Sequence, residues 1–257
     1  MGKADLHIHT TASYDGTATP AATLEYVRSN TNLDVIAVTD HDSVDGALLA
    51  LDLAPRYGVE VIPGVEVSTA DGHLLALFVK KDIPRNLSLL KTVEYVAGLG
   101  GICVVPHPGG RWNGSVQEEA ICSVLNDASL GHYLVGIETY NASLPRLETN
   151  EIANAINGRL QLASVGNSDS HMLWTIGQGW TEFEGETAAD LRSALLAKQT
   201  RAMNKQRPWS FYPSYVQTQL LRSAGIVNCL SDQAEGKILR RWLPELPITN
   251  PIRQMIW

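Results

Sequence analysis

Short apolar runs alternate with amphipathic stretches over about the first 185 residues of the chain. The run at 33–39, Leu-Asp-Val-Ile-Ala-Val-Thr, predicts a strand buried on both faces, as the strands of parallel sheets are. Similar runs predict strands at 59–67, 73–79, 101–106, 133–139 and 160–166. Apolar spacing and capping residues between these runs predict helices at 20–30, 86–100, 143–158 and 187–197. Strands that alternate with helices in this way predict βα units around a parallel sheet or barrel.

The pattern changes after about residue 200. The segment 207–213, Arg-Pro-Trp-Ser-Phe-Tyr-Pro, is rich in aromatic residues, is broken by prolines and has no period, and helices are expected at 215–224 and 233–242. We therefore expect two parts, a barrel of residues 1–199 and a basic, aromatic C-terminal extension of residues 200–257 that packs on the barrel. Aromatic rings interleaved with arginine also suit contact with single-stranded nucleic acid or an anionic surface, which is the alternative for this segment.

The composition excludes several classes of protein. Of the 257 residues, 44% are hydrophobic and 18% charged, which excludes a disordered, collagen-like or coiled-coil chain. No apolar run approaches the roughly 18 residues of a membrane span, and the first residues lack the apolar segment of a signal peptide. Three cysteines are too few for a disulfide framework or a thiolate zinc site, so we expect a cytoplasmic protein.

The charge is divided unevenly. Residues 1–197 hold 11 basic and 24 acidic side chains, whereas residues 198–257 hold 9 basic and 3 acidic ones, and the net charge of the chain is −7. An acidic body repels long polyanions, so small substrates are favoured over long nucleic acids.

Six of the seven histidines lie at the ends of predicted strands or in short polar motifs beside Asp, Glu or Gly. These are His7, His9, His41, His73, His107 and His171. His7 and His9 are two residues apart, a spacing that places both imidazoles on one face of a strand. Any one of these histidines is compatible with a structural role. All of them in one cavity with carboxylates are hard to explain as packing, because burial of so many polar groups is costly without cations. Nitrogen and oxygen ligands without thiolate suit zinc, manganese or iron.

The motifs in which these residues lie resemble those of the PHP (polymerase and histidinol phosphatase) superfamily. The resemblance covers roughly residues 4–182 and rests on Asp5-Leu6-His7-Ile8-His9-Thr10, Ser13-Tyr14-Asp15-Gly16, Thr39-Asp40-His41-Asp42, Gly64-Val65-Glu66, Pro106-His107-Pro108 and Ser168-Asp169-Ser170-His171. It implies an α/β fold, a distorted (β/α)7 barrel, with up to three metal ions at the carboxyl ends of the strands.

The resemblance also implies a ligand set for two or three divalent ions (Mn, Zn or Fe). The first ion would be held by His7, His9, Glu66 and Asp169. Glu66 would bridge to a second ion held by His73 and His107, and a third would be held by Asp15, His41 and His171.

Such a cluster implies hydrolysis of a phosphate ester by a metal-activated hydroxide. Asp40 would orient a ligand or relay a proton, or would only cap the loop after its strand. Arg111, just past His107, would clamp the phosphate, or would be an exposed surface arginine. Glu138 ends a strand as the ligands do and would support them from behind, while His132 would be structural or exposed.

The expected substrate is a nucleotide or another small phosphorylated metabolite. The chain departs here from the small nucleotide-acting members of the family, which often carry an insertion that shapes the substrate pocket, because the 33 residues between His73 and His107 leave no room for a substantial inserted domain. The alternatives are a nuclease acting on oligonucleotide ends, a histidinol-phosphate-type phosphatase and, more remotely, a non-catalytic scaffold stabilised by metals. The sequence does not indicate an oligomeric state.

Overall fold

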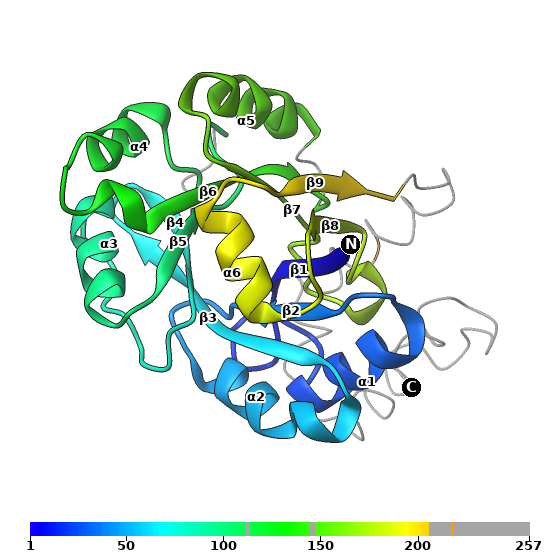
Figure 1. Cartoon of the computed structure of the whole chain (residues 1–257). Helices are drawn as coiled ribbons and strands as arrows, with labels where there is room; N and C mark the ends of the chain where they lie inside the picture. The colour runs from blue at the N-terminus through cyan, green and yellow to red at the C-terminus, as the bar shows by residue number, and fades with distance from the viewer. Residues whose placement is uncertain (111–113, 144–146, 206–216, 218–257) are drawn as a thin grey trace.

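Nine strands form one barrel-shaped sheet in the computed structural model, which describes residues 1–110, 114–143, 147–205 and 217 (Figure 1). The order across the sheet is β7-β6-β5-β4-β3-β2-β1-β8-β9. The strands are β1 (Gly2–Ile8), β2 (Val35–Val38), β3 (Glu60–Thr69), β4 (Gly72–Leu77), β5 (Ile102–Val105), β6 (Leu134–Asn141), β7 (Ala163–Asn167), β8 (Gly179–Phe183) and β9 (Arg201–Asn204). Sequence reasoning did not predict β8 and β9.

The sheet is mixed, which corrects the expectation of parallel strands throughout. β1, β2 and β3 pair in parallel, as do β5, β6 and β7, but β4 runs antiparallel to both β3 and β5. Only Ala70 and Asp71 separate β3 from β4, and a parallel crossover needs a dozen or more residues. β8 runs antiparallel to β1 and β9.

Side-chain hydrogen bonds help to close the barrel where β7 meets β8. The Thr181 hydroxyl on β8 accepts from the Gly166 amide (3.1 Å) and donates to the Gly166 carbonyl (2.9 Å) on β7. The Thr200 hydroxyl donates to the Ser164 carbonyl at 2.8 Å. The predicted barrel is thereby confirmed as a nearly closed one.

Six α-helices lie among the described residues: α1 (Pro20–Asn30), α2 (Asp45–Tyr57), α3 (Leu89–Gly98), α4 (Glu118–Leu125), α5 (Leu147–Leu160) and α6 (Ala188–Leu196). Short 3-10 turns cover Gly131–Tyr133 and Leu173–Thr175. The predicted helices at 20–30, 86–100, 143–158 and 187–197 correspond to α1, α3, α5 and α6. Thr187 and Asp190 form a capping box at the start of α6. The predicted helices at 215–224 and 233–242 lie outside the described residues except for Gln217.

Sequence reasoning missed α2 and α4. The N-cap of α2 is Val44, which makes no side-chain capping bond, and the helix contains Pro55. Neither feature marks a helix in a sequence. Gln117 at the N-cap of α4 makes no side-chain capping bond either.

The apolar core has two parts, one on each side of the sheet. The inner part fills the barrel and includes Leu6, Leu75 and Val104, and α6 packs Leu191 and Leu195 against it. The amide of Ala188 donates to Glu60, the first residue of β3, and Arg192 donates to the carbonyl of Gly100, just before β5. Helix α6 therefore covers the barrel at the amino ends of these strands, while the other helices surround it (Figure 1). The opposite end, where the parallel strands end, is left for the candidate site.

Among the described residues, no helix is long and apolar enough to cross a membrane. The division at residue 199 stays a prediction, because most of residues 200–257 lie outside the described part of the chain. Within that part, β9 continues the barrel sheet past residue 199 by pairing with β8.

Candidate metal centre

His7, on β1, and His9, just after it, meet at one point. Ala4 and Asp5 pair with Val35 and Ile36, but the register against β2 shifts between Asp5 and Ile8. Across this irregular stretch, Leu6 packs inside the barrel and Ile8 packs outside it. Such irregularities re-aim side chains near active sites. Both imidazoles reach Glu66: its Oε2 lies 3.1 Å from Nε2 of His7 and 3.2 Å from Nε2 of His9.

Glu66, on β3, is the centre of the cluster. In addition to the contacts with His7 and His9, its Oε2 lies 3.3 Å from Nδ1 of His41. Its Oε1 lies 2.8 Å from Nδ1 of His73 and 3.2 Å from Nε2 of His107. His73 is the second residue of β4, and the antiparallel direction of β4 places the start of this strand where the parallel strands end. One buried carboxylate thus faces five imidazoles.

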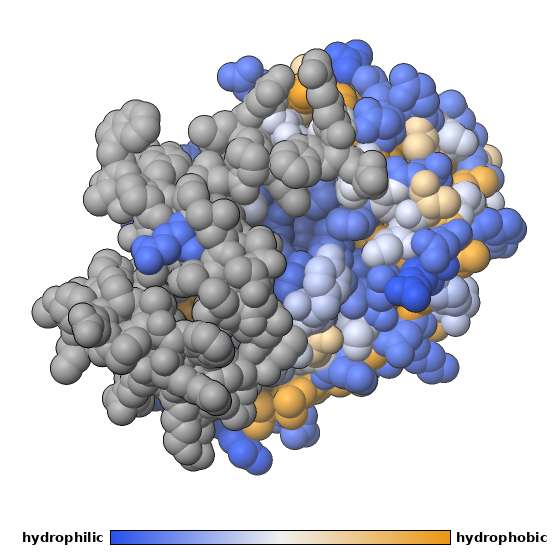
Figure 2. Space-filling view, turned by 180° about the vertical axis from the view of Figure 1, so that it is seen from behind, coloured by the Kyte–Doolittle hydropathy of each residue, from blue (hydrophilic) through white to orange (hydrophobic). Residues whose placement is uncertain are grey.

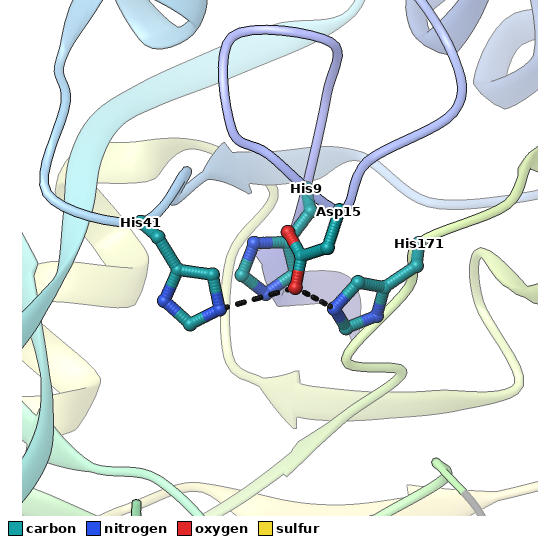
Figure 3. A group of neighbouring side chains, drawn as sticks. All are labelled: His9, Asp15, His41 and His171. Atoms are coloured by element: carbon teal, nitrogen blue, oxygen red, sulfur yellow. Dashed lines mark hydrogen bonds and ion pairs between the residues drawn. The ribbon is translucent and has the colours of Figure 1, made fainter. Parts of the chain in front are cut away.

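Asp15 forms a second group with histidines from three other segments. Its Oδ2 lies 3.0 Å from Nε2 of His171 and 3.3 Å from Nε2 of His41. Figure 3 shows these two imidazoles on either side of the Asp15 carboxylate, with His9 behind it. The hydroxyl of Ser13 donates to the other oxygen of Asp15 at 2.9 Å, which orients the carboxylate.

Asp169 lies between the two groups. Its Oδ1 is 3.5 Å from Nε2 of His9 and 3.6 Å from both Nε2 of His7 and Nδ1 of His171. Asp169 has a φ of 50° and His107 a φ of 31°, left-handed values that are uncommon outside glycine. Strained backbone of this kind clusters at functional sites.

The structure brings together all nine residues expected to bind metal. These residues form four overlapping groups, and within each group the ligand atoms all lie within 4.8 Å of one another. The groups are His9, Asp15, His41 and His171; His7, His9 and Glu66; His7, His107 and Asp169; and His41, Glu66 and His73. That these residues bind ions stays a prediction.

Glu138 packs behind the cluster and is fully buried. Its Oε1 accepts from Nδ1 of His7 (3.2 Å) and from the amide of Asn167 (2.8 Å). Its Oε2 accepts from the backbone amide of His107 and from Nδ2 of Asn141, both at 2.8 Å. Burial raises the pKa of Glu138, but His7 and His107 together outweigh burial and lower this pKa below its usual value. A charged acceptor on Nδ1 fixes the tautomer in which Nε2 of His7 is free to act as a ligand.

Three further residues were singled out in the sequence: Asp40, Arg111 and His132. Both oxygens of Asp40 are taken by Thr10, from the backbone amide (2.5 Å) and the hydroxyl (2.7 Å), so Asp40 fixes the start of the loop that carries Asp15. This contact is to a different loop from the one after its own strand that Asp40 was expected to cap, and the expected role of Asp40 in orienting a ligand or relaying a proton stays a prediction. Arg111 lies outside the described residues. His132 is exposed, with its ring 4.1 Å from that of Tyr133, in agreement with the expectation.

The buried nitrogens of the cluster fit metal ions. Nε2 of His7 and both ring nitrogens of His9 are buried and have no hydrogen-bond partner among the described residues. Burial lowers the pKa of His9, but the carboxylates of Asp169 and Glu66 outweigh this effect and raise it to about 10. The pKa of Glu66 is shifted in the other direction. Burial raises it, but the surrounding imidazoles outweigh burial and hold it well below its usual value. Without cations, protons on the imidazoles neutralise the negative charge of the carboxylates. Divalent ions would take over this role and displace the protons.

The cluster lies at the end of the barrel opposite α6. Seen from that side, the surface is hollowed and hydrophilic residues line the hollow (Figure 2). The fold and the site together are those of an enzyme of the metallohydrolase type, with a polar cluster at the carboxyl ends of barrel strands.

Comparison with known proteins identifies the family. The model of the PHP domain matches residues 5–171, and a PHP-associated model matches residues 148–200. The chain therefore belongs to the PHP domain family, which its motifs resemble. It is accordingly a metal-dependent hydrolase of phosphoric esters, as predicted.

Three similar proteins illustrate the range of the family. An uncharacterized protein of Methanocaldococcus jannaschii is 34% identical over 150 residues, which are 54% of this chain and 82% of that protein. A 3′,5′-nucleoside bisphosphate phosphatase of Chromobacterium violaceum is 32% identical over 98 residues, 37% of this chain and 34% of that protein. The crystal structure of a two-domain protein of Bacteroides vulgatus, with a PHP-like metal-dependent phosphoesterase, superposes with a TM-score of 0.64 at 21% identity, over 79% of this chain and 64% of that one. This last likeness confirms the PHP-type barrel.

Proposed function

We propose that this protein hydrolyses the phosphate ester of a nucleotide or another small phosphorylated metabolite, using two or three divalent ions (Mn, Zn or Fe). The observation that carries the proposal is the position of Glu66, whose two oxygens face different imidazoles within one buried cluster. A carboxylate with both oxygens directed at separate ligand groups suits a bridge between two ions.

The nine residues divide into overlapping groups around this bridge. His7, His9 and Asp169 would hold one ion with Glu66, and His73 and His107 a second. Asp15, His41 and His171 would hold a third. Divalent ions held by these residues would supply a water of lowered pKa as nucleophile and would neutralise the charge that develops on the phosphoryl oxygens.

The surrounding residues keep these side chains in place. Glu138 holds His7 in the required tautomer, and Ser13 orients Asp15. Asp40, through Thr10, fixes the loop on which Asp15 lies. Preorganised groups of this kind need no rearrangement as the reaction proceeds.

Small phosphorylated substrates fit the charge of the chain, because the acidic body repels long polyanions except near bound cations. The Chromobacterium violaceum relative, named as a phosphatase of 3′,5′-nucleoside bisphosphates, supports a nucleotide. We include Arg111 in the proposal as a clamp for the phosphate, since a guanidinium matches two phosphate oxygens at once.

The experiment is a measurement of phosphate release by manganese-loaded protein. The panel contains nucleoside monophosphates, nucleoside bisphosphates, sugar phosphates, histidinol phosphate and short oligonucleotides. We expect release by the wild-type chain and its loss in Asp169→Asn, while Asp52→Asn, on the exposed surface of α2, keeps the wild-type rate.

The outcomes separate the alternatives. Preference for oligonucleotide ends would replace the small-molecule proposal by a nuclease, and preference for histidinol phosphate would indicate that narrower phosphatase. Equal release in the wild type and in Asp169→Asn would contradict the proposed site. No release from the whole panel, with manganese shown to be bound, would favour a metal-stabilised scaffold.

A further inference from the structure

Tyr14 is a large aromatic residue exposed at the edge of the candidate site. Its side chain is 75% exposed, and it precedes Asp15 directly in the loop between β1 and α1. Its ring lies 5.1 Å from the ring of His41, with the two planes within 16° of parallel. One face of the tyrosine therefore stacks on an imidazole of the cluster while most of the side chain is open to water.

The loop that carries Tyr14 is held at several points. The amide of Thr11 donates to the carbonyl of Ala18 at 2.9 Å, and the amide of Ser13 donates to the carbonyl of Thr10 at 3.1 Å. The amide of Thr17 donates to the carbonyl of His171, also at 3.1 Å, which joins the loop to the opposite side of the cluster. The ring is thus presented from a fixed backbone, which limits the entropy lost when a ligand packs on it.

An aromatic ring in this position suits one kind of ligand. Nucleic-acid bases are planar, and each of the bases can stack on an exposed aromatic side chain. The ring is one stacking distance from His41, which also contacts Asp15 and Glu66. A nucleotide joins its base to its phosphate through a single ribose, so its phosphate can reach the cluster while its base reaches Tyr14.

We propose that Tyr14 is the platform on which the base of a nucleotide stacks, and that it selects base-bearing esters over simple sugar phosphates. This inference rests on the proposed function, because it places the phosphate of the same ligand at the candidate metal centre. It covers both a free mononucleotide and the terminal nucleotide of a short oligonucleotide, since the two share the stacked base.

The test compares ligands that differ in the base alone. Adenosine and ribose ligands with a 5′-phosphonate, in which carbon replaces the ester oxygen and prevents hydrolysis, are titrated into manganese-loaded protein by calorimetry. The wild-type chain is expected to bind the adenosine ligand more tightly. In Tyr14→Ala the ratio of the two dissociation constants is expected to fall by about 5- to 150-fold, the range for loss of one base–aromatic stack. Tyr14→Phe is expected to keep the ratio, because it keeps the ring.

Control measurements separate stacking from damage to the cluster. Tyr95→Ala, a change of another exposed tyrosine on α3, is expected to leave both affinities unchanged. The manganese affinity of each variant is measured in parallel, since removal of the ring also removes a contact of His41. An unchanged ratio in Tyr14→Ala, or no preference for the adenosine ligand in the wild type, would overturn the inference.

The measurement of ligand binding and the measurement of phosphate release test different claims. Absence of phosphate release from every ester would refute the proposed function, while the ligand ratio would still test Tyr14. A ligand with the same phosphonate on a dinucleotide distinguishes the two sources of the base: tighter binding than the mononucleotide supports an oligonucleotide end, and weaker binding supports a free nucleotide.

Discussion

Replacement of Glu138 by glutamine tests how the buried carboxylate prepares His7 for metal binding. The carboxylate accepts four hydrogen bonds, two at each oxygen, from His7, Asn167, His107 and Asn141. A glutamine amide has one oxygen and one NH₂ group, so it can satisfy only one of these two sides. With the NH₂ group toward His107, both the backbone amide of His107 and the Asn141 side chain would lose their acceptor.

The other orientation is less costly, and it changes His7. The NH₂ group then faces Nδ1 of His7, which becomes an acceptor by moving its proton to Nε2. Nε2 is the atom 3.1 Å from Glu66, and once protonated it cannot act as a ligand. Only Asn167 loses an acceptor, at a cost of about 1–3 kcal/mol in the free energy of unfolding.

We therefore expect Glu138→Gln to fold and to bind manganese about 10- to 100-fold more weakly, as is typical when a partner behind a metal-binding histidine is removed. Free manganese is followed by electron paramagnetic resonance during a titration, and stability by urea unfolding. Glu94→Gln, at an exposed ion pair with Lys91 on α3, is the matched control and is expected to bind as the wild type does. A folded Glu138→Gln with wild-type manganese affinity would refute the reasoning.

Two further predictions concern the same centre. The pKa of His9 in the metal-free protein is raised to about 10, so His9 is protonated at pH 7. Manganese binding is therefore expected to release protons and to strengthen as the pH rises. Calorimetry in two buffers of different ionisation enthalpy measures this proton release, and a heat of binding that is the same in both buffers would contradict it. A Cβ added at Gly46 would meet Asp40 Oδ2 and would lie 2.6 Å from Thr10 Oγ1, so Gly46→Ala is expected to lower the free energy of unfolding by about 1–3 kcal/mol. Gly98→Ala is the control, because nothing lies within 4 Å of its Cβ position, and equal stability of the two variants would argue against the role given to Asp40.

Much of the candidate site could be predicted from the sequence, because its residues lie in short motifs at strand ends. Asp40 and His41 follow the apolar run at 33–39, Pro106 ends the run at 101–106 and Asn167 follows the run at 160–166. The barrel geometry alone gathers the residues at these strand ends. The α/β class followed from the same alternation of elements.

The remainder depends on contacts between distant segments. The direction of β4 is set by a two-residue connection, and the pattern of its apolar residues is the same for either direction. The shift in β1 depends on its pairing with β2, so a regular strand was the natural expectation for His7 and His9. The role of Asp40 depends on Thr10, 30 positions away, and proximity in the fold decides whether a carboxylate joins the cluster or holds a loop.

The central claim is that Glu66 and the imidazoles around it hold divalent ions. The most direct measurement is anomalous X-ray scattering at the manganese edge from crystals of the manganese-loaded protein. The account predicts two or three anomalous peaks within coordination distance of the nine clustered residues, one on each side of the Glu66 carboxylate. Crystals that contain stoichiometric manganese but show no anomalous peak at Glu66 would contradict it.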